Sequence, residues 1–251
     1  MHDAVERAIA VMWERFNEPI SLADLADAAI LSRFYFSRVF RSITGTSPGR
    51  FLSAIRVHEA KSLLLDTAMS VTDISYQVGY NSPGTFTSRF SRSVGLTPTQ
   101  YRDPSGSGIL PPIPVTAGVG DPAVRGRVVL PGTDTPLRIY VAAFRTPIPE
   151  GMPVSCDVLD GDRRTFELYG LQDGTWYVRA AAVEYPNLNP RPSRRRPLFV
   201  SGGPSITVRS GWNVETRVAL HPMCVFDLPL LLALPELDGR EQQQVLAAVR
   251  C

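Results

Sequence analysis

Two stretches decide the fold of this chain: FSRVFRSITGTSP at residues 36–48 and FTSRFSRSVGLTP at residues 86–98. In each stretch two phenylalanines stand four residues apart, which places them on one face of a helix. A glycine follows where such a helix would end, and a proline comes three residues later. The positions return at an offset of 50: Phe36, Phe40, Gly45 and Pro48 match Phe86, Phe90, Gly95 and Pro98. The sequence therefore predicts one small helical structure that is built twice.

Helical signals continue on both sides of the repeated stretches. We expect helices over residues 2–16, from the cap Ser21 onward, from Ser32 to Gly45 and over about residues 48–65. Asp24 follows Ser21 by three residues and forms a near capping box. The pattern recurs in SVTDISYQV, where Ser70 matches Ser21 at an offset of 49, and a last helix is expected over about residues 83–94. The repeated structure is therefore a whole helix–turn–helix unit.

The helix expected over residues 32–44 has two different faces. Phe36, Phe40 and Ile43 form an apolar stripe that should be buried. Arginine and serine side chains on the other face can reach guanine edges and phosphates, and an aromatic ring can touch a thymine methyl. Taken alone, such a helix could present a charged face to solvent. The presence of a second copy of the unit favours DNA binding over that alternative. The outward face carries Arg33, Phe34, Ser37, Arg38 and Arg41.

The helix between the two units has a length that suits DNA. About 18 residues at 1.5 Å each give a rod of about 27 Å. With the widths of the units added, two reading helices could stand roughly 34 Å apart, which is one turn of duplex. Arg50, Arg56 and Lys61 on this helix are then candidates for contacts with the phosphates between the two grooves.

Composition limits the class of protein. Of 26 basic residues only Lys61 is a lysine, and arginine recognises phosphate and guanine with paired hydrogen bonds, although a codon bias gives the same composition. Three widely spaced cysteines indicate neither a disulfide framework nor a zinc site. The N-terminus is typical of an amphipathic helix and not of a signal peptide, and the apolar run at 228–235 is too short to span a bilayer. We expect a cytoplasmic protein that needs no cofactor or metal. We do not expect an enzyme, because no nucleophile–base pair or phosphate loop stands out in the sequence.

Taken in order, these residues resemble the DNA-binding domain of the AraC/XylS transcription regulators. The resemblance covers about residues 4–103 and includes VTDISYQVGYNSPGTFTSRF at 71–90, then Thr97-Pro98 and Tyr101-Arg102. It implies seven helices in two homeodomain-like helix–turn–helix units, and a transcription activator that binds promoter DNA. RNA polymerase, a small-molecule or protein effector at the C-terminal half, and a second copy of the chain are the other partners to consider.

The resemblance also implies which residues contact DNA. Base-reading positions fall on Phe34, Ser37 and Arg38 in the first unit, joined by Arg33, and near Pro83, Gly84, Thr87 and Ser88 in the second. We expect phosphate contacts from Arg41, Arg50, Arg56, Ser82, Arg89 and Arg92. Two features depart from the family. The family usually places this domain at the C-terminus behind a sensor domain, whereas here the domain comes first. In addition, the second reading helix has short side chains. We therefore expect the first unit to supply most sequence specificity and the second unit to anchor.

The second half of the chain has a different character. It holds 18 of the 22 prolines, and residues 104–122 have the composition of a linker. About seven short alternating runs over residues 123–222 are typical of a β-sandwich, with a hairpin turn at residues 172–174. The pattern that includes Gly126, Val128, Phe166 and Leu168 resembles a carboxypeptidase-regulatory-like or prealbumin-like sandwich. Residues 223–251 should form an extension with helices at about 226–234 and 240–250.

The expected fold class is thus multidomain, with an all-α domain at residues 1–103 and a mainly-β sandwich with short terminal helices behind it. Trp176 and Trp212 could stack on a sugar or an aromatic effector, although a core role for Trp176 is the alternative. RPSRRRP at 191–197 could contact phosphates or be a solvated loop. Two rival functions remain open. One is an architectural protein that bends DNA, and the other is a carbohydrate- or protein-binding sandwich tethered to DNA.

Overall fold

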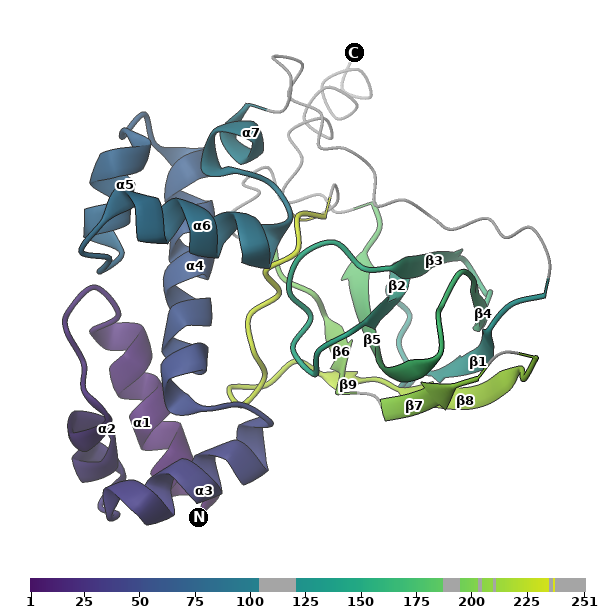
Figure 1. Cartoon of the computed structure of the whole chain (residues 1–251), viewed down its shortest axis with the longest axis horizontal. Coiled ribbons are helices and arrows are strands. Elements are labelled where there is room, and N and C mark those ends of the chain that lie inside the picture. The colour runs from purple at the N-terminus through teal and green to yellow at the C-terminus, as the bar shows by residue number, and fades with distance from the viewer. Residues whose placement is uncertain (104–120, 187–194, 203–204, 210, 235–236, 238–251) are drawn as a thin grey trace. The chain divides into compact units, whose positions relative to one another are not determined.

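The computed structural model describes residues 1–103, 121–186, 195–202, 205–209, 211–234 and 237 (Figure 1). Its contacts divide the chain into two compact units. The first unit consists of Met1–Arg102 together with Cys224–Leu231, and the second of Asp103–Met223 with Leu232–Cys251. Each unit has its own hydrophobic core.

Residues 1–102 of the first unit form seven helices. Four of them begin at a serine whose side-chain oxygen accepts a hydrogen bond of 3.0–3.4 Å from the backbone N–H three residues on, at Ser21, Ser32, Ser70 and Ser82. This confirms the starts expected from the cap residues. The helices are α1 (His2–Glu14), α2 (Leu22–Ala29), α3 (Arg33–Thr44), α4 (Pro48–Asp66), α5 (Val71–Gln77), α6 (Pro83–Val94) and α7 (Pro98–Arg102).

The long helix α4 lies between two groups of helices, α1–α3 and α5–α7, and packs against members of both (Figure 1). Each group is centred on three buried aromatic rings, with successive ring centroids 5.4–5.6 Å apart. The third ring of each set repeats at the same offset of 50 as the first two, a correspondence that our sequence reasoning missed. The two sets are Phe36, Phe40 and Phe51, and Phe86, Phe90 and Tyr101.

Residues 224–231 also belong to the helical unit. Phe226 and Leu228 pack against the core formed by α1–α4, and the Phe226 ring meets the His2 ring edge-on at 5.5 Å. The segment is not helical, so the expectation of a helix over residues 226–234 is wrong. Pro229 explains the difference, because proline has no N–H for a helix interior and disfavours helical backbone at the preceding residue.

The second unit contains two β-sheets. A three-stranded sheet has the order β4 (Thr165–Leu168), β1 (Val124–Val129), β8 (Val214–Ala219), in which β1 and β8 run parallel. A six-stranded antiparallel sheet has the order β3 (Ser155–Asp160), β2 (Leu137–Phe144), β5 (Gly174–Glu184), β6 (Phe199–Ser201), β9 (His221–Pro222), with β7 (Ser205–Val208) paired to β5. Both sheets contribute to one core, which includes Val124, Ile139, Phe166, Trp176 and Val218.

The hairpin expected at residues 172–174 does not form. β4 pairs with β1 in the small sheet and β5 pairs with β2 in the large sheet, so residues 169–173 cross from one sheet to the other. Phe166 on β4 and Trp176 on β5 are both buried in the same core. A hairpin would instead place both strands in one sheet, where they could not face each other across that core.

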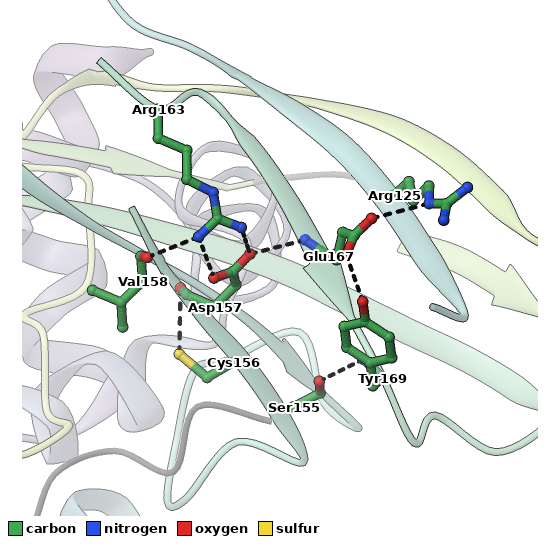
Figure 2. A network of polar contacts seen from close by, with 8 residues as sticks. All are labelled: Arg125, Ser155, Cys156, Asp157, Val158, Arg163, Glu167 and Tyr169. Carbon is green, nitrogen blue, oxygen red and sulfur yellow. Dashed lines mark hydrogen bonds and ion pairs between the residues drawn. The ribbon is translucent and has the colours of Figure 1, made fainter. Parts of the chain in front are cut away.

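Side chains of β3 close the free edge of β4 (Figure 2). The Glu167 N–H donates to the Asp157 carboxylate at 2.9 Å, and the Tyr169 N–H donates to Ser155 Oγ at 3.0 Å. Asp157 also accepts two hydrogen bonds from Arg163, at 2.7 and 3.1 Å. Unpaired N–H groups at an edge are costly when buried and attract other strands when exposed. The contacts from Ser155 and Asp157 therefore join the two sheets at this corner.

Candidate nucleic-acid interface

The turns between α2 and α3 and between α5 and α6 have the same backbone structure. In the first turn the N–H of Ile30 donates to the Asp27 carbonyl and that of Leu31 to the Ala26 carbonyl, both at 2.9 Å. In the second turn Gly79 and Tyr80 make the equivalent bonds to Tyr76 and Ser75, both at 3.0 Å. Each bond therefore recurs at an offset of 49. Two short helices are thus held against α3 and α6 by one repeated turn.

The exposed face of α3 is basic and contains no acid. Phe34 is 75% exposed, and the Arg38 guanidinium carbon lies 5.7 Å from the centre of its ring. A guanidinium near the face of an aromatic ring is attracted by the ring, which favours one orientation of Arg38. Arg33 and Arg41 are exposed on the same helix, and Ser37 is half-buried. These five residues therefore lie where the sequence places them.

The corresponding face of α6 is flatter. Gly84 and Ser88 are exposed, Pro83 and Thr87 are half-buried, and none has a long side chain. Ser82 caps the helix, since its oxygen accepts from the Thr85 N–H at 3.2 Å and its hydroxyl contacts Thr85 Oγ1 at 3.3 Å. The side chains on this face therefore extend less far from the helix than those of α3, as the short residues in the sequence predict.

The arginines expected at phosphates differ in exposure. Arg41, Arg50 and Arg92 are exposed and can contact an extended anion. Arg89 is half-buried, and its Nε donates to Ser53 Oγ on α4 at 2.9 Å. Arg89 is therefore partly engaged within the helical unit.

The expectation that Arg56 contacts phosphate needs correction. Its guanidinium donates to the backbone carbonyls of Phe16 at 2.7 Å and Glu18 at 2.8 Å, and it lies over the Tyr80 ring at 5.9 Å. Burial lowers the pKa of Arg56 from its ordinary value. Phe16 and Glu18 follow α1, whereas Tyr80 follows α5. Arg56 therefore joins the two helix groups from its place on α4, a role that sequence reasoning missed.

Lys61 is likewise turned inward and not toward DNA. It is 5% exposed, and its Nζ donates to the Leu230 carbonyl at 3.5 Å and lies 5.5 Å from the centre of the Tyr101 ring. The sequence could not have indicated this partner, because Leu230 is 169 residues away along the chain.

The aromatic candidates in the second unit differ in position. Trp176 is completely buried, and its indole N–H donates to the Gln172 carbonyl at 2.8 Å, so it belongs to the core and cannot stack on an effector. Trp212 is 71% exposed and stays a candidate. Of the run RPSRRRP, residues 191–194 lie outside the described residues, and Arg195 is buried.

The thiol of Cys156 is buried in the second unit. Burial raises the pKa of Cys156 to about 12, so its thiol stays protonated and unreactive at neutral pH. Within the described ranges, no group of three or more His, Cys, Asp or Glu side chains is arranged to hold a metal ion. The helices of the described segments include none with the length and apolar character needed to cross a membrane.

Comparisons with known proteins concern the helical part. A family model described as a helix-turn-helix domain matches residues 25–104. The lactose operon transcription activator of Staphylococcus xylosus is 28% identical over 102 residues, which are 41% of this chain and 37% of that protein. An uncharacterised HTH-type transcriptional regulator of Haemophilus influenzae is 41% identical over 94 residues, which are 38% of this chain and 31% of that protein. The chain thus spans about a third of the length of these relatives.

Among solved structures, a transcriptional regulator of Chromobacterium violaceum with an AraC-type DNA-binding domain is 28% identical. The match covers 40% of this chain and 90% of that one, with a TM-score of 0.39. The residues that the family model matches include α3, α6 and the repeated turns that precede these two helices. The chain carries a helix-turn-helix domain at residues 25–104.

Proposed function

We propose that this protein is a sequence-specific transcription regulator that activates promoters by placing α3 and α6 in two successive major grooves. The observation that carries this function is the repeated scaffold, which exposes one acid-free face on each of two helices. α4 has 19 residues and a length of about 28 Å, which supports a separation near one turn of duplex, about 34 Å, between the two helices. The activator role follows from the lactose operon activator, a relative over this domain.

Within this function we assign different roles to the two helices. Arg38, positioned by Phe34, reads a base edge together with Arg33 and Ser37. Arg41, Arg50 and Arg92 bind phosphates. Gly84, Thr87 and Ser88 on α6 approach the second groove closely but offer few long contacts, so α6 mainly anchors the protein.

Selection of bound DNA from a random library with the full chain tests the function. We expect a bipartite site whose two parts lie about 10 bp apart, with one part better defined. Arg38→Ala should relax the preference at its contacted base and cost about 1–3 kcal/mol of specific binding. Arg41→Ala is the matched control, which should weaken binding equally on all sequences and reduce the salt dependence by about one counterion.

Two results would contradict these assignments. If Arg38→Ala left the selected site unchanged while Thr87→Ala and Ser88→Ala relaxed it, α6 would be the specific reader. A sequence-specific regulator should prefer the selected DNA over random DNA by about 10³-fold. If the selected DNA competed no better than random DNA, the protein would be an architectural DNA binder. The short side chains on α6 favour this second candidate function.

For the second unit we propose a sandwich of the carboxypeptidase-regulatory-like or prealbumin-like type that senses an effector, pairs two copies or contacts RNA polymerase. Its two sheets with a common core support this architecture. Trp212 in this unit stays the candidate for stacking on an aromatic effector or a sugar.

A further inference from the structure

The outer face of the three-stranded sheet carries an open groove of about 550 Å³. The groove volume lies in the range of small-ligand sites, about 300–1,000 Å³. The groove is lined by polar side chains and one glycine, and none of the lining residues is aromatic. The lining residues are Arg125, Gly126, Arg127, Thr165, Glu215, Thr216 and Arg217.

Strand register places these charges in two rows across the sheet. In one row Arg125 on β1 is beside Glu167 on β4 and Glu215 on β8, and Arg125 donates to Glu167 at 3.1 Å. The positive charge in this row is therefore balanced by carboxylates on both sides.

The next row has no such balance. Arg127 on β1 is beside Thr165 on β4 and Arg217 on β8. Neighbouring strands lie about 4.8 Å apart, and like charges directly opposite each other destabilise a sheet. Both arginines are exposed, and within the described residues neither has a carboxylate partner. An oxyanion between them would remove the repulsion and accept hydrogen bonds from both guanidinium groups.

We propose that this groove binds a sugar phosphate, with its phosphate held by Arg127, Arg217 and the hydroxyl of Thr165. Phosphate suits this row because it accepts paired hydrogen bonds from two arginines at once. The Glu215 carboxylate, at the neighbouring row, accepts hydrogen bonds from sugar hydroxyls. A nucleobase is a poorer fit, because the groove offers no aromatic ring for stacking. Trp212 does not line the groove, and the proposal does not depend on the DNA-binding function.

Calorimetric titration of the full chain with glucose 6-phosphate tests the site, with glucose and inorganic phosphate as comparison ligands. We expect glucose 6-phosphate to bind, inorganic phosphate to bind more weakly, and glucose not to bind. Arg127→Gln and Arg217→Gln should each weaken glucose 6-phosphate binding at least about tenfold, since each removes one charge-assisted pair. Arg209→Gln, an exposed arginine just beyond β7, makes the same charge change and should have no effect.

A thermal measurement separates loss of the site from loss of folding. Because the substituted side chains are exposed and repel each other, both variants should melt no lower than the wild type without ligand. Glucose 6-phosphate should raise the melting temperature of the wild type and of Arg209→Gln, but not of Arg127→Gln or Arg217→Gln.

Three outcomes would overturn the proposal. The first is the absence of binding to the wild type, or equal binding by all variants. The second is equal affinity for inorganic phosphate, which would exclude a role for the sugar. The third is that Arg127→Gln and Arg217→Gln weaken DNA binding while no phosphate monoester binds, which would make the groove part of the DNA-binding surface.

Discussion

Ile30 and Gly79 occupy the same place in the two repeated turns but meet different constraints. Both adopt left-handed backbone, with φ of 58° and 82°. A Cβ on Gly79 would lie 2.9 Å from the Phe16 carbonyl oxygen, so only glycine fits there. Ile30 is 79% exposed and meets no such barrier, but left-handed backbone costs an L-residue about 1–2 kcal/mol. The first turn therefore carries strain that the second avoids.

Ile30→Gly is expected to raise the free energy of unfolding by about 1 kcal/mol, since it removes this strain and few side-chain contacts. Gly79→Ala is the matched change at the equivalent position and should lower it by more than about 1 kcal/mol. Urea unfolding followed by far-ultraviolet circular dichroism measures both. A less stable Ile30→Gly variant would show that the first turn is not strained.

At the scale of elements, α4 joins the two helix groups through Arg56. This side chain contacts the segment after α1 by hydrogen bonds and the segment after α5 through the Tyr80 ring. Gly79 lies next to the Arg56 guanidinium, because a Cβ added at Gly79 would lie 3.1 Å from the guanidinium carbon. The orientation of α6 relative to α3 therefore depends on contacts that meet at one position on α4.

Arg56→Ala is expected to lower the free energy of unfolding by about 2 kcal/mol, because two carbonyls lose a charged donor. Arg50→Ala, an exposed arginine on the same helix, should change it by less than about 0.5 kcal/mol. For DNA binding we expect the opposite ranking of the two variants. Arg50→Ala should reduce the salt dependence of binding by about one counterion, whereas Arg56→Ala should leave it unchanged. A stable Arg56→Ala variant with reduced salt dependence would restore Arg56 as a phosphate contact.

At the scale of the whole molecule, the helical unit is not one continuous stretch of chain. Cys224–Leu231 returns to it after the strands of the second unit, and contributes Phe226 and Leu228 to its core. Asp227 shapes this segment by accepting a hydrogen bond from the Cys224 N–H at 2.8 Å. A fragment that ends at residue 103 would lack these contacts, so DNA binding and stability are best measured on the full chain.

Phe226→Ala is expected to destabilise the helical unit by about 1–2 kcal/mol, less than a fully buried phenylalanine, because the side chain is only partly buried. Val225→Ala, its exposed neighbour, is the matched control and should have little effect. Hydrogen exchange measured on peptides from α1 and α4 reports the stability of this unit directly. Unchanged exchange in Phe226→Ala would mean that the segment only lies on the surface of the unit.

The sequence by itself determined the helices between residues 2 and 94 and most of the α3 face. A helix is made of hydrogen bonds four residues apart, so its ends depend on local residues such as Ser21, Ser32 and Gly45. The repeat at an offset of 50 added the information that two units are alike. Exposure of Phe34 and Arg38 followed from the helical period alone.

Only the tertiary structure decided which partners distant residues find. Strand pairing joins segments far apart in the chain, so alternation located strands near β4 and β5 but could not show that they lie in different sheets. Arg56 and Lys61 have the same charge as surface arginines, and only packing showed that their donors meet backbone carbonyls. The same holds for Arg127 and Arg217, which are 90 positions apart in sequence and become neighbours through a parallel strand pair.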